Sequence, residues 1–195
     1  EGEHMERTKE EQQRYNINLS YRTLVGLLET NFPDGACVIT LDYWRDYPAP
    51  GKLRAEDQFV AWIRSARRRL GAAFPHICAM GWNEKGDRYP IHRVVTALPL
   101  ASGAFVAGYW GYGDPKVETV PREGLEALAR LMMREALEKG RVREFRRRTW
   151  RSYGLVRPEK VGKNGKTEKD HHSGEHCQDD SIHGPGTQGR GAGQG

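Results

Sequence analysis

The sequence predicts an α+β domain in which a mainly antiparallel sheet is covered by helices. Three observations lead to this prediction. Apolar residues recur at helical spacing in three long segments, short runs rich in β-branched residues lie between them, and clusters of Asn, Gly and Pro separate the runs. The chain of 195 residues contains no uninterrupted apolar run of the length that a bilayer requires, so no transmembrane helix is expected.

Three segments have the spacing of amphipathic helices. The first covers residues 8–30, where Leu24 and Leu28 belong to one apolar face, and the turn sequence 31–35 ends it. The second covers residues 53–70, and its arginines lie largely off the apolar face. The third covers residues 123–139.

Strands are expected where short apolar runs are bounded by turn signals. These runs cover residues 36–43, 76–82, 88–98, 104–109 and 116–120. The sequence 83–86 between the second and third runs is expected to form a hairpin turn. Eight apolar residues on the inward faces are expected to form the core. They are Val38, Ile39, Leu41, Phe59, Ile63, Leu70, Val94 and Leu128.

Composition divides the chain into three parts. Residues 1–5 are expected to be leftover sequence before a natural start at Met5, and residues 6–160 form a single domain. Residues 161–195 are rich in Gly, Asp, His and Lys and nearly lack large aliphatic residues, so a disordered tail is predicted. The three cysteines are odd in number and widely spaced, which favours a reducing compartment such as the cytoplasm.

Basic residues concentrate near the end of the predicted domain. Residues 134–160 contain ten basic and four acidic side chains, within an overall net charge of +5. Guanidinium groups neutralise phosphates and aromatic faces stack on unpaired bases, so this segment predicts an interface for nucleic acid or for a nucleic-acid-loaded partner. The alternative is a solvated helix end. The candidate residues are Arg134, Arg141, Arg143, Arg146, Arg147, Arg148, Trp150 and Arg151.

The domain resembles a known family in several segments that occur in the family's order. They cover residues 8–13, 36–43, 59–70, 83–95, 110–113, 128–135 and 147–152. In these segments the chain is similar to the rolling-circle replication initiator proteins of phages and plasmids, the HUH endonuclease class. The resemblance implies an HUH initiator-like fold, an origin on a mobile genetic element and a location in the cytoplasm of a bacterial host.

The chemistry of this family needs two histidines on one strand to hold a divalent metal and a helix tyrosine to attack the phosphodiester. The second histidine falls on His92, whereas the first falls on Pro90 and the tyrosine on Leu131. The carboxylate of a neighbouring strand falls near Gly81, and the family's assisting lysine falls on Arg134. We therefore expect His92 to be a vestige, with no cofactor and at most weak binding of a divalent metal. A histidine within a strand is also commonly structural.

Three functions follow as alternatives. The first is a non-catalytic descendant of an initiator that binds nucleic acid or a nucleoprotein complex through its basic surface. The second is an anti-CRISPR-type inhibitor that binds a nucleic-acid-guided effector nuclease and blocks its DNA binding or cleavage. The third is an active nicking endonuclease with a displaced tyrosine. A covalent protein–DNA adduct formed with Mn²⁺ would favour the third.

Overall fold

The computed structural model describes residues 8–46, 50–82, 90–137 and 149–158. These residues belong to one compact unit that ends at Pro158. The predicted tail, residues 1–5 and the predicted turn at residues 83–86 lie outside the described residues. No helix of the described part has the length and apolar character needed to cross a membrane.

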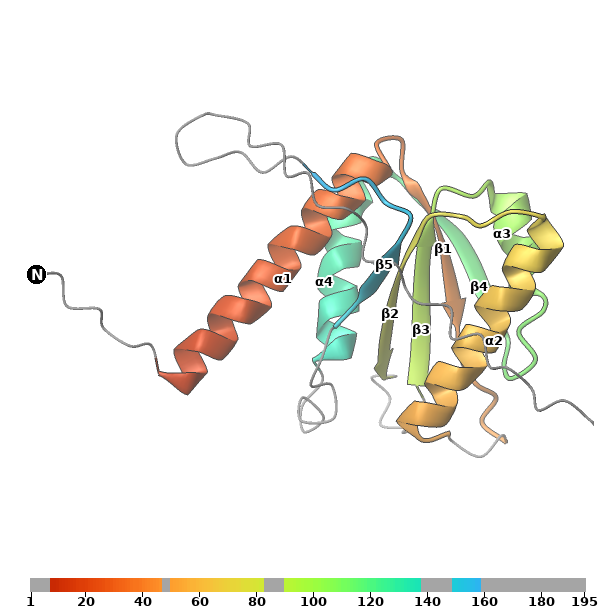
Figure 1. The fold of residues 1–195 in the computed structure, drawn as a ribbon, viewed down its shortest axis with the longest axis horizontal. Coiled ribbons are helices and arrows are strands. Elements are labelled where there is room, and N and C mark those ends of the chain that lie inside the picture. Colours follow the sequence, from red (N-terminus) through yellow and green to blue (C-terminus); the bar gives the residue numbers. More distant parts are fainter. Residues whose placement is uncertain (1–7, 47–49, 83–89, 138–148, 159–195) are drawn as a thin grey trace, which may run out of the picture. The chain divides into compact units, whose positions relative to one another are not determined.

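A five-stranded antiparallel sheet with the strand order β4-β1-β3-β2-β5 forms the centre of the unit (Figure 1). This confirms the predicted α+β class with an antiparallel sheet. The strands are β1 (Ala36–Leu41), β2 (His76–Trp82), β3 (Pro90–Thr96), β4 (Lys116–Val120) and β5 (Arg151–Tyr153). The central strand β3 pairs with β1 through Ile39 and Val94, and with β2 through Cys78 and Val94.

Helices cover both faces of the sheet because successive strand residues point to opposite sides. Val38 packs with α1 (Lys9–Asn31) and α4 (Leu125–Ala136), while its neighbour Ile39 packs with α2 (Lys52–Leu70) and α3 (Leu100–Ala107). A short 3₁₀ turn, Arg122–Gly124, leads into α4. The sheet therefore separates two apolar layers, one on each face.

The helix α1 begins at a capping box. Thr8 Oγ1 accepts a hydrogen bond from the Glu11 backbone N–H at 3.3 Å, and the Thr8 N–H donates to the Glu11 carboxylate at 2.9 Å.

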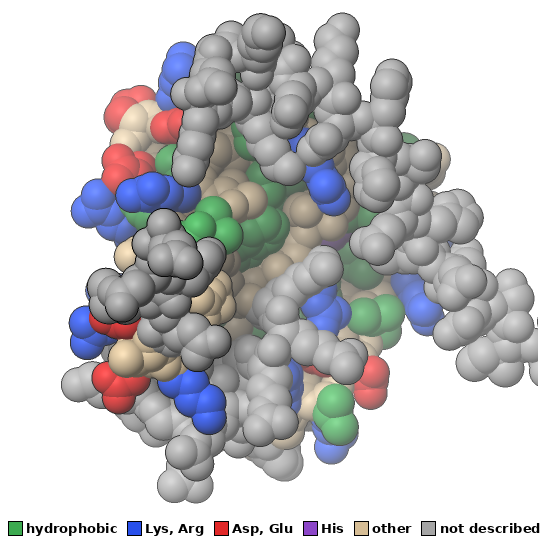
Figure 2. All heavy atoms as spheres, turned by 60° about the vertical axis from the view of Figure 1, so that its left-hand side comes forward, with side chains coloured by type: hydrophobic (Ala, Val, Ile, Leu, Met, Phe, Trp, Pro, Cys, Tyr) green, Lys and Arg blue, Asp and Glu red, His purple; other side chains and the backbone are tan. Residues whose placement is uncertain are grey.

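Figure 2 turns the α1 side of the molecule forward. Hydrophobic atoms show at the centre of that face, and side chains of both charge signs lie around them.

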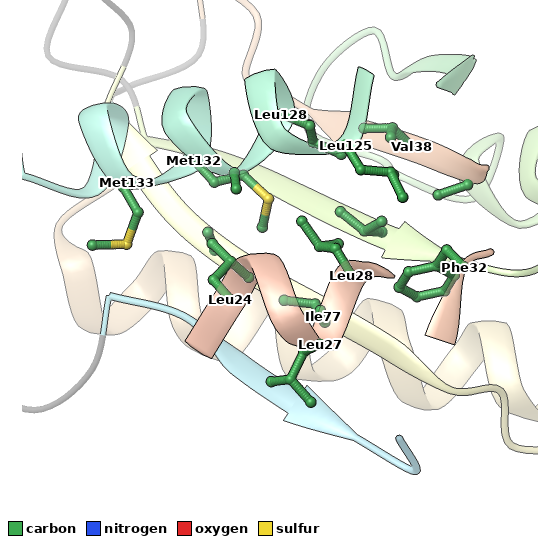
Figure 3. Packing of buried hydrophobic residues seen from close by; sticks show 14 residues of the cluster. Leu24, Leu27, Leu28, Phe32, Val38, Ile77, Leu125, Leu128, Met132 and Met133 are labelled. Atoms are coloured by element: carbon green, nitrogen blue, oxygen red, sulfur yellow. The ribbon is translucent and has the colours of Figure 1, made fainter. Parts of the chain in front are cut away.

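The core beneath α1 and α4 contains closely packed leucine, methionine and aromatic side chains (Figure 3). Leu24 and Leu28 from α1 point toward Ile77 of β2, and Met132 lies above them on α4. Of the eight residues expected in the core, six are buried, and Phe59 and Leu70 are partly buried. The buried six are Val38, Ile39, Leu41, Ile63, Val94 and Leu128.

One predicted strand is wrong. Residues 104–109 do not form a strand, because Leu100–Ala107 folds as α3 and Tyr109 follows its end. Pro99 precedes the helix with a φ of −54°, which proline adopts by constraint. The segment is rich in alanine, which has the highest helix propensity. The helix also packs closely on β1 at Gly103, where a Cβ would lie 2.6 Å from the Cys37 sulfur.

Candidate nucleic-acid interface

The C-terminal half of α2 is strongly cationic. Trp62, Ile63 and Ala66 bury the inner side of this half against the sheet. Four arginines occupy the remaining positions, and no acidic residue occurs in the sequence from Gln58 to Trp82. The four are Arg64, Arg67, Arg68 and Arg69, of which Arg67 is half-buried and the others are exposed. Cations also stabilise a helix C-terminus, so part of this pattern serves the helix itself.

Arg67 connects α2 to the edge strand β5. Its guanidinium carbon lies 4.0 Å from the centre of the Tyr153 ring. The same ring stacks on His76 at a centroid distance of 5.7 Å, and Tyr153 is the register partner of His76 in the sheet. Burial lowers the pKa of His76, and the charge of Arg67 acts in the same direction. Tyr153 is therefore fixed between a cation and a histidine that favours the neutral form.

Arg69 makes the corresponding contact on the other side of α2. Its guanidinium carbon lies 3.5 Å from the centre of the Tyr109 ring, which follows α3. The Tyr109 ring in turn meets Phe105 edge-on at a centroid distance of 5.4 Å. Both aromatic side chains are exposed, Tyr109 by 41% and Phe105 by 50%. An arginine thus contacts an aromatic ring on each side of the end of α2.

The described members of the predicted site fall in different places. Arg151 begins β5, and its guanidinium contacts Glu56 of α2 at 3.4 Å. Both side chains reach solvent, so this ion pair is worth little and leaves Arg151 able to meet a phosphate. Arg134 is exposed on α4, on the opposite face of the sheet from α2.

Trp150 has a structural environment. Its indole N–H donates to Ser20 Oγ at 3.1 Å, and the ring packs against the core layer of α1 and α4. A tryptophan held in this way is not a free platform for a base. The remaining predicted arginines lie outside the described residues; they are Arg141, Arg143, Arg146, Arg147 and Arg148.

His92 is enclosed by aromatic rings on the α2 side of the sheet. Phe59 stacks on its imidazole at 5.0 Å, and Trp110 meets it edge-on at 5.8 Å. The residue is 1% exposed, and no described residue bonds its Nε2. Burial lowers the pKa of His92 to about 3, so the imidazole is neutral near pH 7.

The structure does not assemble the pocket that the resemblance implied. His92 faces α2, whereas Leu131 belongs to α4, which packs on the other face of the sheet. A Cβ at Gly81 would point at Glu135 of α4, so position 81 also faces away from His92. Pro90 lies two residues before His92 and shares its side. The resemblance implied that positions 81, 90, 92 and 131 surround one pocket, and this is wrong. Positions 90 and 92 face α2, whereas positions 81 and 131 lie on the α4 side of the sheet.

The side chain that faces α4 is that of the next residue, Arg93. Its guanidinium donates to both carboxylate oxygens of Glu135, at 2.6 and 2.7 Å, and to Thr40 Oγ1 at 3.0 Å. Glu135 is 7% exposed and Arg93 is 14% exposed. A bidentate ion pair therefore fills this part of the α4 face. Within the described ranges, no three His, Cys, Asp or Glu side chains are grouped so that they could hold a metal ion.

These features define an α+β domain with an arginine-rich, partly aromatic surface at the end of α2. Comparison with known proteins adds no relative: no family model, no curated protein and no solved structure matches the chain. Sequence reasoning missed Phe105 and Tyr109. Two features of the sequence could have indicated this surface. No acidic residue accompanies the arginines of α2, and Phe105 and Tyr109 lie in and just after the short apolar segment 100–107.

Proposed function

We propose that this chain binds nucleic acid without cleaving it, through a surface formed by the C-terminal half of α2 and by β5. The observation that carries the proposal is the contact of Arg67 with Tyr153. It joins the arginines of α2 to β5, which carries Arg151 and lies far from α2 in the sequence. We call this surface the α2–β5 surface.

The chemistry of the α2–β5 surface suits phosphates. Guanidinium groups stay charged at all relevant pH values and bind phosphate oxygens in a bidentate manner. Arg64 and Arg68 are exposed one helical turn apart, so both side chains leave the same side of α2. Arg151 of β5 pairs with Glu56 in the N-terminal half of α2, and a phosphate can replace Glu56 in so weak an ion pair.

The non-catalytic part of the proposal is supported by the surroundings of His92 and Arg93. An imidazole enclosed by Phe59 and Trp110 does not present a nitrogen to a phosphodiester. On the other face, the guanidinium of Arg93 holds both carboxylate oxygens of Glu135, and the backbone and Cβ of Glu135 lie against Gly81. Descent from a replication initiator, an origin on a mobile element and inhibition of an effector nuclease stay predictions.

The test is binding of a fluorescent single-stranded oligonucleotide at several salt concentrations. We expect Arg64→Ala/Arg68→Ala to weaken binding about tenfold and to lower the salt slope, d log K/d log[salt], by about 1.4, which corresponds to two lost phosphate contacts. The matched control is Arg14→Ala/Arg22→Ala, which removes two exposed arginines from α1 on the other face of the sheet. Equal losses in the two variants would contradict the proposal.

Two further measurements separate the alternatives. Replacing Arg146, Arg147 and Arg148 with Ala should weaken binding about tenfold or more if the segment before β5 extends the surface. Incubation with labelled DNA and Mn²⁺ should give no covalent protein–DNA adduct. An adduct would contradict non-catalytic binding and support the nicking endonuclease. Weak binding to naked nucleic acid together with inhibition of a CRISPR effector nuclease would favour the inhibitor.

A further inference from the structure

The contacts around the end of α2 form a row of rings and cations, with a cation–ring contact on each side of the helix. We call this row the aromatic–arginine strip. It consists of Tyr153 with Arg67 on the β5 side of α2, and of Arg69 with Tyr109 and Phe105 on the α3 side. The strip extends the α2–β5 surface to α3, which the basic residues alone did not suggest.

The helix geometry explains why the strip can span two neighbours. Positions 67 and 69 are two residues apart, so their side chains leave α2 in directions about 200° apart. One guanidinium therefore reaches β5 and the other reaches the end of α3. Arg68, between them, projects outward and is exposed. The strip thus carries an additional solvent-facing cation at its centre.

The aromatic members of the strip are more exposed than packing requires. Phe105 is 50% exposed and Tyr153 is 41% exposed, although α3 has a buried side of its own at Gly103 and Val106. A phenylalanine that is half in water contributes little to the core, and its exposed part is available to a ligand. The edge-on contact with Tyr109 fixes the orientation of the Phe105 ring.

We propose that the aromatic–arginine strip holds an unpaired segment of a nucleic-acid strand, with a base stacked on Phe105 and phosphates at Arg68 and Arg69. This inference rests on the proposed function and adds the form of the ligand. An unpaired strand offers both flat base faces and phosphates, and the strip offers both exposed rings and guanidinium groups to receive them. In a duplex each base face is covered by the neighbouring base, so no face is free to stack on the Phe105 ring. An acidic protein would satisfy the arginines but would leave the exposed rings without matching partners.

The experiment compares a labelled single strand with the duplex of the same sequence on the full chain. We expect Phe105→Ala to weaken binding of the single strand about tenfold and to leave duplex binding unchanged. Phe105→Trp should retain or strengthen single-strand binding, because the stacking surface is kept. The matched control is Leu100→Ala, at a residue of the same helix that is 49% exposed and lies outside the strip.

The outcomes distinguish this inference from the proposed function. If the wild-type protein binds both forms and Phe105→Ala changes neither, or weakens both equally, the strip does not select unpaired bases and the inference fails alone. If neither form binds, the proposed function fails and the inference fails with it. If poly-glutamate displaces the single strand as efficiently as unlabelled oligonucleotide does, the strip binds acidic protein and the inference is overturned. Circular dichroism of each variant verifies that the fold is retained.

Discussion

Replacing His92 should remove part of the acid sensitivity of the fold. Burial between Phe59 and Trp110 lowers the pKa of this imidazole from 6.5 to about 3. The unfolded chain therefore binds a proton below about pH 6.5, whereas the folded chain does so only near pH 3. Stability consequently falls as the pH drops through this window. Between about pH 7 and pH 5 this single group accounts for a loss of about 2 kcal/mol in the free energy of unfolding.

The assay is urea denaturation followed by circular dichroism at several pH values between about 7 and 5. His92→Phe keeps a ring in the aromatic enclosure and cannot titrate, so its free energy of unfolding should lose about 2 kcal/mol less than that of the wild type over this range. His92→Leu serves if the larger ring does not fit. His76, whose pKa is also lowered by burial, is present in both proteins, so the comparison isolates His92. Identical pH profiles would refute the reasoning.

Three substitutions test the packing of the sheet by the same denaturation measurement. Glu135→Ala leaves the guanidinium of Arg93 buried without its partner and should cost about 3–5 kcal/mol; a cost below 1 kcal/mol would show that the pair is dispensable. Gly81→Ala places a Cβ 2.5 Å from the Glu135 Cβ and should destabilise by about 1–3 kcal/mol, whereas a neutral result would show that α4 shifts freely. Ile39→Ala should cost about 2–5 kcal/mol against almost nothing for Leu53→Ala, which is 77% exposed, and similar costs would contradict the described core.

Local patterns were enough to predict the elements whose apolar residues are bounded by clear turn or end signals. The short β-branched run in residues 36–43 and the helical spacing in residues 53–70 led to β1 and α2 within a few residues. The short apolar segment before Tyr109 was assigned wrongly, because a run with no polar positions has no period that separates a strand from a helix. Its conformation depends on Gly103 packing against Cys37, which is a contact between distant parts of the chain.

The candidate site was only partly predictable for a related reason. Composition pointed to Trp150 and Arg151 as neighbours in one basic segment, but their side chains enter different layers of the structure. The pairing of Arg67 with Tyr153 depends on β5 joining the sheet beside β2, and three residues are too few to show a strand period. The resemblance predicted His92 to be the vestige of a metal site beside position 131, whereas the strand register places His92 on the side of α2.

The final described segment is tied to the first helix. Asn31 exchanges hydrogen bonds of 2.8 Å with the backbone of Val156, across 125 residues of chain, and Trp150 reaches Ser20 across 130. During translation the outer edge of β2 therefore stays unpaired until the end of the domain has left the ribosome. Such long-range closure is slow to form, and a nascent chain that stalls before residue 151 would expose an open strand to aggregation.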